Sequence, residues 1–147
     1  MNEKKIKRVF QQGPISGAYI GESIAAHSRK KEIGAHSIFL GQVRDDDKLN
    51  SKVSAIEYTA YEDMANQQFH EIREAMFQKY PLTCLHIYHS LGIVKAGEIS
   101  LFVFTSSPHR QAAIEACTEI VERVKKEVPV WGREILENER SEWKVNL

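Results

Sequence analysis

The segment EISLFVFT, residues 98–105, constrains the fold most strongly, because it is almost wholly apolar. A strand with one face in water alternates apolar and polar residues, whereas a strand covered on both faces is apolar throughout. The segment is therefore predicted to be a central strand of a sheet, with other elements packed on each of its faces.

Two helices with apolar stripes are predicted to pack on this sheet. The stripe of the first helix recurs at helical spacing and consists of Ala65, Phe69, Ile72, Met76 and Tyr80. The stripe of the second consists of Ala113, Cys117, Ile120, Val121, Val124 and Val128. Pro81 and Pro129 end these helices. The second is predicted to begin at Ser107-Pro108, because serine is a favoured N-cap and proline suits the first helical position.

Three other segments are predicted to be strands, namely residues 35–43, 53–61 and 83–90. Residues 53–61 alternate with period two, which is typical of a strand. The first two are separated by the charged loop 44–52, so they are predicted to pair as a hairpin. Residues 91–97 are predicted to be a turn that leads into the central strand.

Four strands and two substantial helices indicate the α+β class, with helices against a mostly antiparallel sheet. A short helix over residues 19–31 is also expected. The length of 147 residues fits one domain, 1–147. The patterns are weakest in residues 1–33 and 132–147, and the tail after Trp131 has no clear periodicity.

The composition excludes several classes of function. Twenty basic residues balance twenty acidic ones, so there is no general attraction for nucleic acid or anionic membranes. Any anion site must be built locally from a few arginines and lysines. No apolar run approaches the ~18 residues of a membrane span, and no secretion signal follows the basic start. Cys84 and Cys117 are far apart, which favours buried free thiols and a cytoplasmic location.

The sequence Ser107-Pro108-His109-Arg110 is the strongest local indication of a binding site. With Ser107 as N-cap, His109 and Arg110 occupy the second and third helical positions, where unpaired N–H groups favour an anion. An arginine can grip phosphate at two points. The alternative is that both side chains are merely exposed. Cations there oppose the helix dipole, so stability does not select them, and this favours the phosphate site.

Two neighbouring lysines differ in their predicted positions on the second helix. At 100° per residue, Lys125 lies about 80° from the axis of the apolar stripe, and Lys126 about 180°. Lys126 is therefore predicted to be a solvated charge, whereas Lys125 can reach along a wall into a pocket. A lysine at such a boundary more often lies along apolar surface with its charge in water.

Arg110 and Lys125 are separated by about 22 Å on a straight helix, because they are 15 positions apart. Both cannot touch one small phosphorylated molecule. If both serve a single substrate, they come from different copies of the chain, which predicts a homodimer with shared sites.

A further cation, Arg44, follows Gly41-Gln42-Val43 at the end of a predicted strand. Glycine at a strand end lets a ligand approach the backbone closely. Three aspartates follow Arg44, so a charge-balanced surface loop explains it equally well. A metal site is not expected from His86 and His89, because residues three apart on a strand point to opposite faces.

Several segments together resemble the large, catalytic subunit of molybdopterin synthase, the MoaE family. These are FLGQVRD, IEYTAYEDMA, IYHSLGIVKAGEI and FTSSPHRQAAIEACTEIVERVKKEVPVW, with GREI matching less well. The resemblance spans roughly residues 34–131, and its most specific part is SSPHR…K…VPVW.

The resemblance implies an α/β hammerhead fold and a sulfurtransferase built on a central dimer of large subunits. A small ubiquitin-like carrier docks on each subunit, completing a heterotetramer, and inserts its C-terminal Gly-Gly thiocarboxylate. The substrate implied is cyclic pyranopterin monophosphate (precursor Z), which takes up two sulfurs as its cyclic phosphate opens to give molybdopterin. No cofactor or metal is implied.

The resemblance places seven residues at the substrate. They are Gln42, Arg44, His109, Arg110, Lys125, Arg133 and Glu134. His109 and Arg110 would come from the neighbouring subunit, and Lys125 would be catalytic. Lys125 would stabilise developing negative charge or exchange protons. The reacting sulfur would come from the carrier.

Two departures from the family pattern leave alternatives open. Family members commonly have a lysine directly after the tryptophan, where this chain has Gly132, and often an arginine at the position of Ser90. Arg133 can replace the charge of that lysine but not its proton transfer. The alternatives are a non-catalytic scaffold that still binds the carrier, or an unrelated phosphate-binding α+β module.

Overall fold

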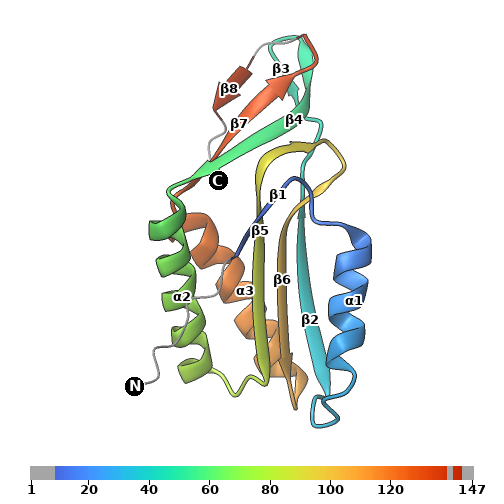
Figure 1. The fold of residues 1–147 in the computed structure, drawn as a ribbon, viewed down its shortest axis with the longest axis vertical. Helices are drawn as coiled ribbons and strands as arrows, with labels where there is room; N and C mark the ends of the chain where they lie inside the picture. Colours follow the sequence, from blue (N-terminus) through green and yellow to red (C-terminus); the bar gives the residue numbers. More distant parts are fainter. Residues whose placement is uncertain (1–8, 139–140, 144–147) are drawn as a thin grey trace.

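A computed structural model describes residues 9–138 and the backbone of residues 141–143. The helices are α1 (Gly17–His27), α2 (Glu62–Lys79) and α3 (Arg110–Glu127). The strands are β1 (Phe10–Gln12), β2 (Ala35–Gln42), β3 (Asp47–Lys48), β4 (Ser51–Ala60), β5 (Cys84–Lys95), β6 (Ile99–Ser107), β7 (Val130–Leu136) and β8 (Ser141–Trp143). The molecule is elongated, with the helices beside one part of the sheet and β3, β4, β7 and β8 forming the other (Figure 1).

The sheet follows the order β2-β6-β5-β4-β7-β8, with β1 added to β5 and β3 to β4. All of these pairings are antiparallel except that of β1 with β5. This confirms the predicted α+β class and mostly antiparallel sheet, and the prediction that residues 98–105 lie centrally. Phe102 and Phe104 pack in a cluster with Ile20 of α1, whereas Leu101 and Val103 belong to the core that includes α2 and α3. Each face of β6 is therefore covered.

The predicted apolar stripes coincide with the buried faces of α2 and α3. The buried residues of α2 are Ala65, Phe69, Ile72 and Met76. Those of α3 are Ala112, Ala113, Ala116, Cys117, Ile120 and Val124. Helix α1 ends at His27, four residues before the predicted end at Lys31. No helix in the described part of the chain is long and apolar enough to cross a membrane.

The predicted hairpin between residues 35–43 and 53–61 is wrong. Strand β2 pairs with β6, and β4 pairs with β5 and β7. The loop between them contains β3, which pairs with β4 through a turn at Leu49 and Asn50, both with positive φ. Period-two alternation indicates a strand but does not identify its partner, because any neighbour that covers the apolar face satisfies the pattern.

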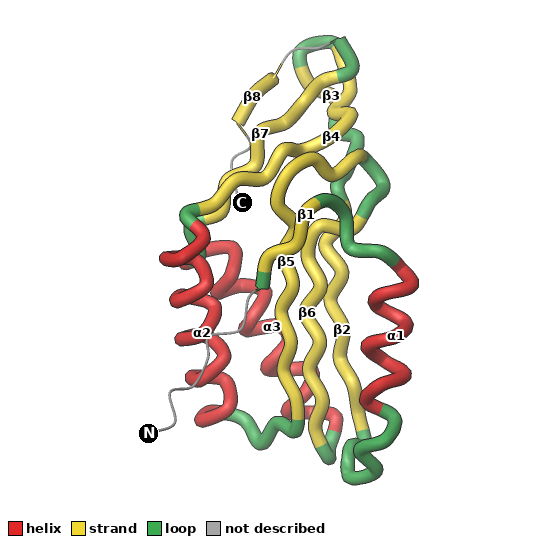
Figure 2. The backbone as a smooth tube through the Cα atoms, in the orientation of Figure 1, coloured by secondary structure: helices red, strands yellow, loops and turns green. Residues whose placement is uncertain are grey.

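Residues 91–97 are not simply a turn, because β5 continues to Lys95. Gly92 has φ +81°, a left-handed conformation that glycine adopts without strain, and the chain bends there. The part of β5 before the bend pairs with β6, and the part from Gly92 to Lys95 pairs with β4. Figure 2 shows the end of β5 curving toward β4 and β7. The bend joins the two parts of the sheet.

The tail after Trp131, which the sequence leaves without a pattern, contains β7 and β8. Strand β7 pairs with β4 from Val130↔Ala60 to Leu136↔Val53. Its periodicity is hidden because Glu134 is buried on the face where an apolar residue would be expected. Burial of this carboxylate is compensated by Lys48, whose Nζ lies 2.7 Å from Glu134 Oε1.

Candidate functional site

A recess opens where the C-terminal end of α3 meets the bend of the sheet. The strands supply Tyr58, His89, Val130 and Gly132, and the end of α3 supplies Val124, Lys125 and Val128. The enclosed part of the recess is small, about 30 Å³, and its mouth opens to solvent. Strands β4, β5 and β7 and the end of α3 therefore meet in one concave place, where Tyr58, His89 and Lys125 are the polar side chains.

His89 lies at the base of this recess and is 5% exposed. Its Nδ1 lies 2.8 Å from the carbonyl oxygen of Ser90. Burial lowers the pKa of His89 to about 4, with a smaller contribution in the same direction from the charge of Lys125 and an opposing one from the bond to Ser90. The imidazole is therefore neutral near pH 7. Because a carbonyl only accepts, Nδ1 carries the hydrogen and Nε2 keeps its lone pair.

Tyr58 packs against His89 from β4, with its ring edge-on at 5.1 Å between centroids. Its hydroxyl donates to Ser100 Oγ at 3.2 Å. Burial raises the pKa of Tyr58 and the charge of Glu134 adds to this effect, while the bond to Ser100 opposes it. Tyr58 therefore presents a neutral hydroxyl and fixes one side of the His89 ring.

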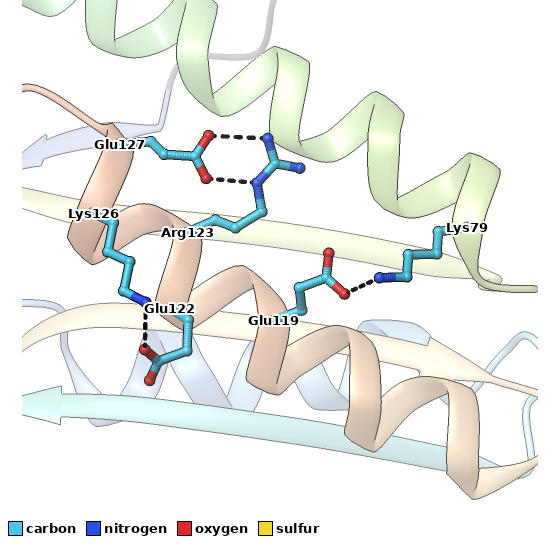
Figure 3. Close-up of polar contacts among 6 residues, drawn as sticks. All are labelled: Lys79, Glu119, Glu122, Arg123, Lys126 and Glu127. Carbon is cyan, nitrogen blue, oxygen red and sulfur yellow. Dashed lines mark hydrogen bonds and ion pairs between the residues drawn. The ribbon is translucent and has the colours of Figure 1, made fainter.

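Lys125 and Lys126 lie on different sides of α3, as the helical angles predict. Lys125 lines the recess and is close enough to influence His89. Lys126 points to the outer surface, where its Nζ lies 4.0 Å from Glu122 Oε2. Figure 3 shows Lys126 in a group of exposed ion pairs that includes Arg123 with Glu127. Such exposed pairs contribute little to stability, so Lys126 has the role of a solvated charge.

The beginning of α3 differs from the prediction. The helix starts at Arg110 with His109 as its N-cap, and Ser107 is still part of β6, paired with Ala35. The prediction of Ser107 as N-cap is therefore wrong, because the sheet extends farther than the helix signal suggests. Ser107 Oγ nevertheless accepts from the backbone N–H of Ala113 at 3.0 Å and donates to the carbonyl of His109 at 2.5 Å. It thus orders the turn that presents His109 and Arg110.

His109 and Arg110 are exposed at the opposite end of α3 from Lys125. The helix runs without a break from Arg110 to Glu127, so the separation along its axis is about 22 Å. A single chain therefore does not bring Arg110 to the recess.

The remaining predicted residues lie outside the recess. Gln42, the last residue of β2, and Arg44 are exposed, and Arg44 Nη2 lies 3.3 Å from Asp46 Oδ2. On β7, Arg133 forms an ion pair with Glu57 and Glu134 with Lys48. Of the seven predicted residues, all of which are described, only Lys125 lines the recess within one chain.

Sequence reasoning missed Tyr58 and His89 as site residues. From the sequence, His86 and His89 are expected to point to opposite faces of their strand. The structure confirms this, because His86 contacts His27 of α1, whereas His89 contacts Tyr58 and Phe10. Both missed residues stand in the segments IEYTAYEDMA and IYHSLGIVKAGEI. The available signal was a polar group between apolar residues two positions away on each side, which share its strand face.

Comparison with known families settles where this chain belongs. The family described as MoaE protein matches residues 12–127, most of the chain. The chain belongs to the MoaE family. A relative from Pyrococcus abyssi, named molybdopterin synthase catalytic subunit, is 41% identical over 116 residues that cover 79% of this chain and 77% of that protein.

Other MoaE relatives differ in length. A molybdopterin synthase catalytic subunit from Drosophila grimshawi is 42% identical over 116 residues, but the match covers 78% of this chain and 32% of that protein. This chain thus spans about a third of the Drosophila protein. A crystal structure of molybdopterin synthase from Staphylococcus aureus has a TM-score of 0.82 and 31% identity, and covers 96% of this chain and 99% of the other. The same fold occurs in a complex of subunits 1 and 2 of molybdopterin-converting factor from Helicobacter pylori, with a TM-score of 0.78 and 22% identity, covering 91% and 87%.

Gly132 is where this MoaE chain departs from the lysine that the resemblance leads one to expect. It pairs with Tyr58 across the sheet, and a Cβ at this position would lie 2.8 Å from Ile56 Cγ2 and 3.4 Å from Tyr58 Cε1. Ile56 is 1% exposed and has little room to move. The neighbours have therefore filled the space that a side chain at position 132 would need.

Gly132→Ala is expected to lower the free energy of unfolding by about 1–3 kcal/mol, because it overpacks a filled site. Gly21→Ala is the matched control, since a Cβ there meets nothing within 4 Å and alanine is favoured over glycine within a helix by up to about 1 kcal/mol. Urea unfolding of both variants measures the difference. A Gly132→Ala protein as stable as the parent chain would contradict the close packing described.

Proposed function

We propose that this chain is the catalytic subunit of a molybdopterin synthase. It transfers sulfur from the C-terminal thiocarboxylate of a small carrier protein to cyclic pyranopterin monophosphate. The observation that carries the proposal is the recess of a MoaE chain in which Lys125 and a neutral His89 meet. Both reactants are anionic there, and a lysine ammonium in a partly enclosed site stabilises negative charge that develops during transfer.

The two polar groups of the recess have complementary chemistry. Lys125 supplies a positive charge and protons, and the lone pair of His89 Nε2 can accept a proton. The hydroxyl of Tyr58 adds a neutral group held by Ser100. In this proposal, Lys125 binds the anionic part of the reactants, and His89 takes part in proton transfer or positions the substrate.

The sulfur in this scheme comes from the carrier and not from the chain. Cys117 lies on the buried stripe of α3, and burial raises the pKa of its thiol. The thiolate is the nucleophilic form of cysteine, so Cys117 is unsuited to attack. Cys84 is also buried, and it does not line the recess.

We further propose that two chains share their sites. Arg110 cannot reach the Lys125 of its own chain, because both lie on one straight helix about 22 Å apart. A homodimer in which one chain places His109 and Arg110 at the recess of the other would assemble the predicted cations around one phosphate. Arg44 forms an exposed ion pair with Asp46, which is weak enough to exchange for a ligand.

The deciding experiment combines the purified chain, a thiocarboxylated carrier and the cyclic pterin phosphate, with molybdopterin as the product measured. We expect product only when all three components are present. The specific alternative is a non-catalytic scaffold, which Gly132 favours because the expected lysine is missing. A chain that binds the carrier but forms no product would establish that alternative and reject the catalytic proposal.

Mixing inactive variants tests the shared site. Arg110→Ala and Lys125→Ala chains are each expected to lose most activity alone. A mixed dimer contains one site with both residues intact, so it should recover up to about half of the activity of the unaltered dimer. The mixed species is isolated by two different affinity tags and assayed for molybdopterin. Verified mixed dimers without recovery would show that sites are not shared.

A further inference from the structure

A second cluster of reactive side chains lies on the face of the sheet that α1 covers, away from the recess. It consists of His27, in the last turn of α1, with Cys84 and His86 on β5. Cys84 and His86 are two residues apart on a strand, so both point to the same face. Their sulfur and ring nitrogens all lie within 4.8 Å of one another and of a ring nitrogen of His27.

The two histidines face each other through the nitrogens that commonly bind metals. Nε2 of His27 lies 3.0 Å from Nε2 of His86, and Nδ1 of His27 lies 2.7 Å from the carbonyl oxygen of Ser23. Because the carbonyl only accepts, Nδ1 of His27 carries the hydrogen, and its Nε2 lone pair points at His86. A backbone carbonyl on the other ring nitrogen is also the usual support of a metal-binding histidine.

The distance between the two ring nitrogens is close to that in a tetrahedral zinc site. With Zn–N bonds of about 2.0–2.1 Å, two nitrogens of one zinc ion lie about 3.3 Å apart, close to the 3.0 Å between His27 and His86. The two imidazoles therefore need only a small adjustment to share one ion, and the sulfur of Cys84 lies within 4.8 Å of both nitrogens.

The sulfur of Cys84 is an acceptor beside the two imidazoles. Nζ of Lys30 donates a hydrogen bond to Sγ of Cys84 at 2.9 Å. Cys84 is buried, while His27 and His86 are only partly buried. One thiolate and two neutral imidazoles form a ligand set of the kind that selects Zn²⁺ over Mg²⁺ or Ca²⁺.

We propose that His27, Cys84 and His86 bind one Zn²⁺ ion, with a fourth position taken by water. The ion joins the end of α1 to the first residues of β5, so its main effect is to hold α1 on the sheet. The site is independent of the proposed catalytic function, because His86 and His89 project from opposite faces of β5. The sequence predicts no metal site from His86 and His89, because these two point to opposite faces. The proposed ligands are instead Cys84, His86 and His27, which come together only when α1 packs on β5.

The test uses the tag-free chain of residues 1–147, freed of metal and titrated with Zn²⁺ and, separately, with Co²⁺. We expect one equivalent to bind per chain, and Co²⁺ to produce the intense near-ultraviolet absorption of a cobalt–thiolate bond. Cys84→Ser should abolish that absorption. Cys84→Ser and His86→Gln should each weaken Zn²⁺ binding by more than about 100-fold, since loss of a ligand exceeds the 10–100-fold effect of losing a supporting group. Cys117→Ser and His70→Gln are matched controls outside the cluster and should bind as the parent chain does.

Thermal unfolding gives a second readout. Saturating Zn²⁺ should raise the Tm of the parent chain and of both controls, because a ligand that binds the folded state stabilises it, and it should leave the Tm of Cys84→Ser unchanged. If a variant does not fold, the measurements on the parent chain alone test the proposal. Absence of a cobalt–thiolate band in the parent chain, or equal Zn²⁺ affinity in Cys84→Ser, would show that the cluster is a hydrogen-bonded histidine pair without a metal.

Discussion

Lys125→Ala is expected to reduce molybdopterin formation at least about 100-fold while leaving the fold intact. A charged group aimed at a site of developing negative charge typically contributes a factor of 10²–10³. Lys125 lines the recess from the edge of the buried stripe of α3 and carries no part of the core. Truncating such a surface side chain changes the free energy of unfolding by about 0.5 kcal/mol or less.

Lys126→Ala is the matched control for this prediction. It removes the same charge from the adjacent residue, but from the outer face of α3, where Lys126 is paired with Glu122. Its activity should equal that of the parent chain. An inactive parent chain would contradict the proposed function. An active parent chain with an equally active Lys125→Ala variant would contradict only the role assigned to Lys125. Normal turnover by Lys125→Ala would remove this lysine from the mechanism.

The stability of the protein is expected to fall by about 3 kcal/mol between pH 7 and pH 4 through His89 alone. Its pKa is about 4 in the folded chain and about 6.5 when unfolded, and 1.36 kcal/mol per pKa unit gives this figure. Between these two values the unfolded chain binds a proton that the folded chain does not. The contribution is therefore complete above pH 6.5 and is lost as the pH falls toward 4.

Urea unfolding at pH 7 and at pH 4.5 measures this effect, with His89→Gln as the comparison. The variant should lose less stability on acidification than the parent chain, by about 2–3 kcal/mol, because it has no group to protonate at this position. His70→Gln, on α2, serves as the control and should follow the parent chain. Equal losses in the parent chain and His89→Gln would mean that His89 is already accessible to protons in the folded protein.

A neutral His89 also matters for the proposed reaction. A protonated imidazole beside Lys125 would place two positive charges in one small recess, which burial makes unfavourable. In the folded chain His89 stays neutral, so Lys125 carries the positive charge and His89 Nε2 keeps its lone pair. The two groups are thus held in different protonation states at the same pH, with Lys125 as a proton donor and His89 Nε2 as a hydrogen-bond acceptor.

The sequence alone determined the central strand, the two amphipathic helices and the family. Burial leaves a periodic record in residue type, so EISLFVFT and the stripe from Ala65 to Met76 were readable without coordinates. The position of Lys125 was also readable, because the angle between residues of one helix is fixed by the backbone geometry. Such features depend on neighbours within one element.

Only the tertiary structure decided the strand pairings and the composition of the two sites. Tyr58, His89 and Lys125 meet because β5 bends at Gly92 and β7 adds to β4, and neither event is encoded by a local period. The same holds for His27 and Cys84, which are far apart in sequence and are brought together by the packing of α1 on β5. Contacts across elements depend on which surfaces cover one another, and a one-dimensional pattern records that a face is covered but not by what.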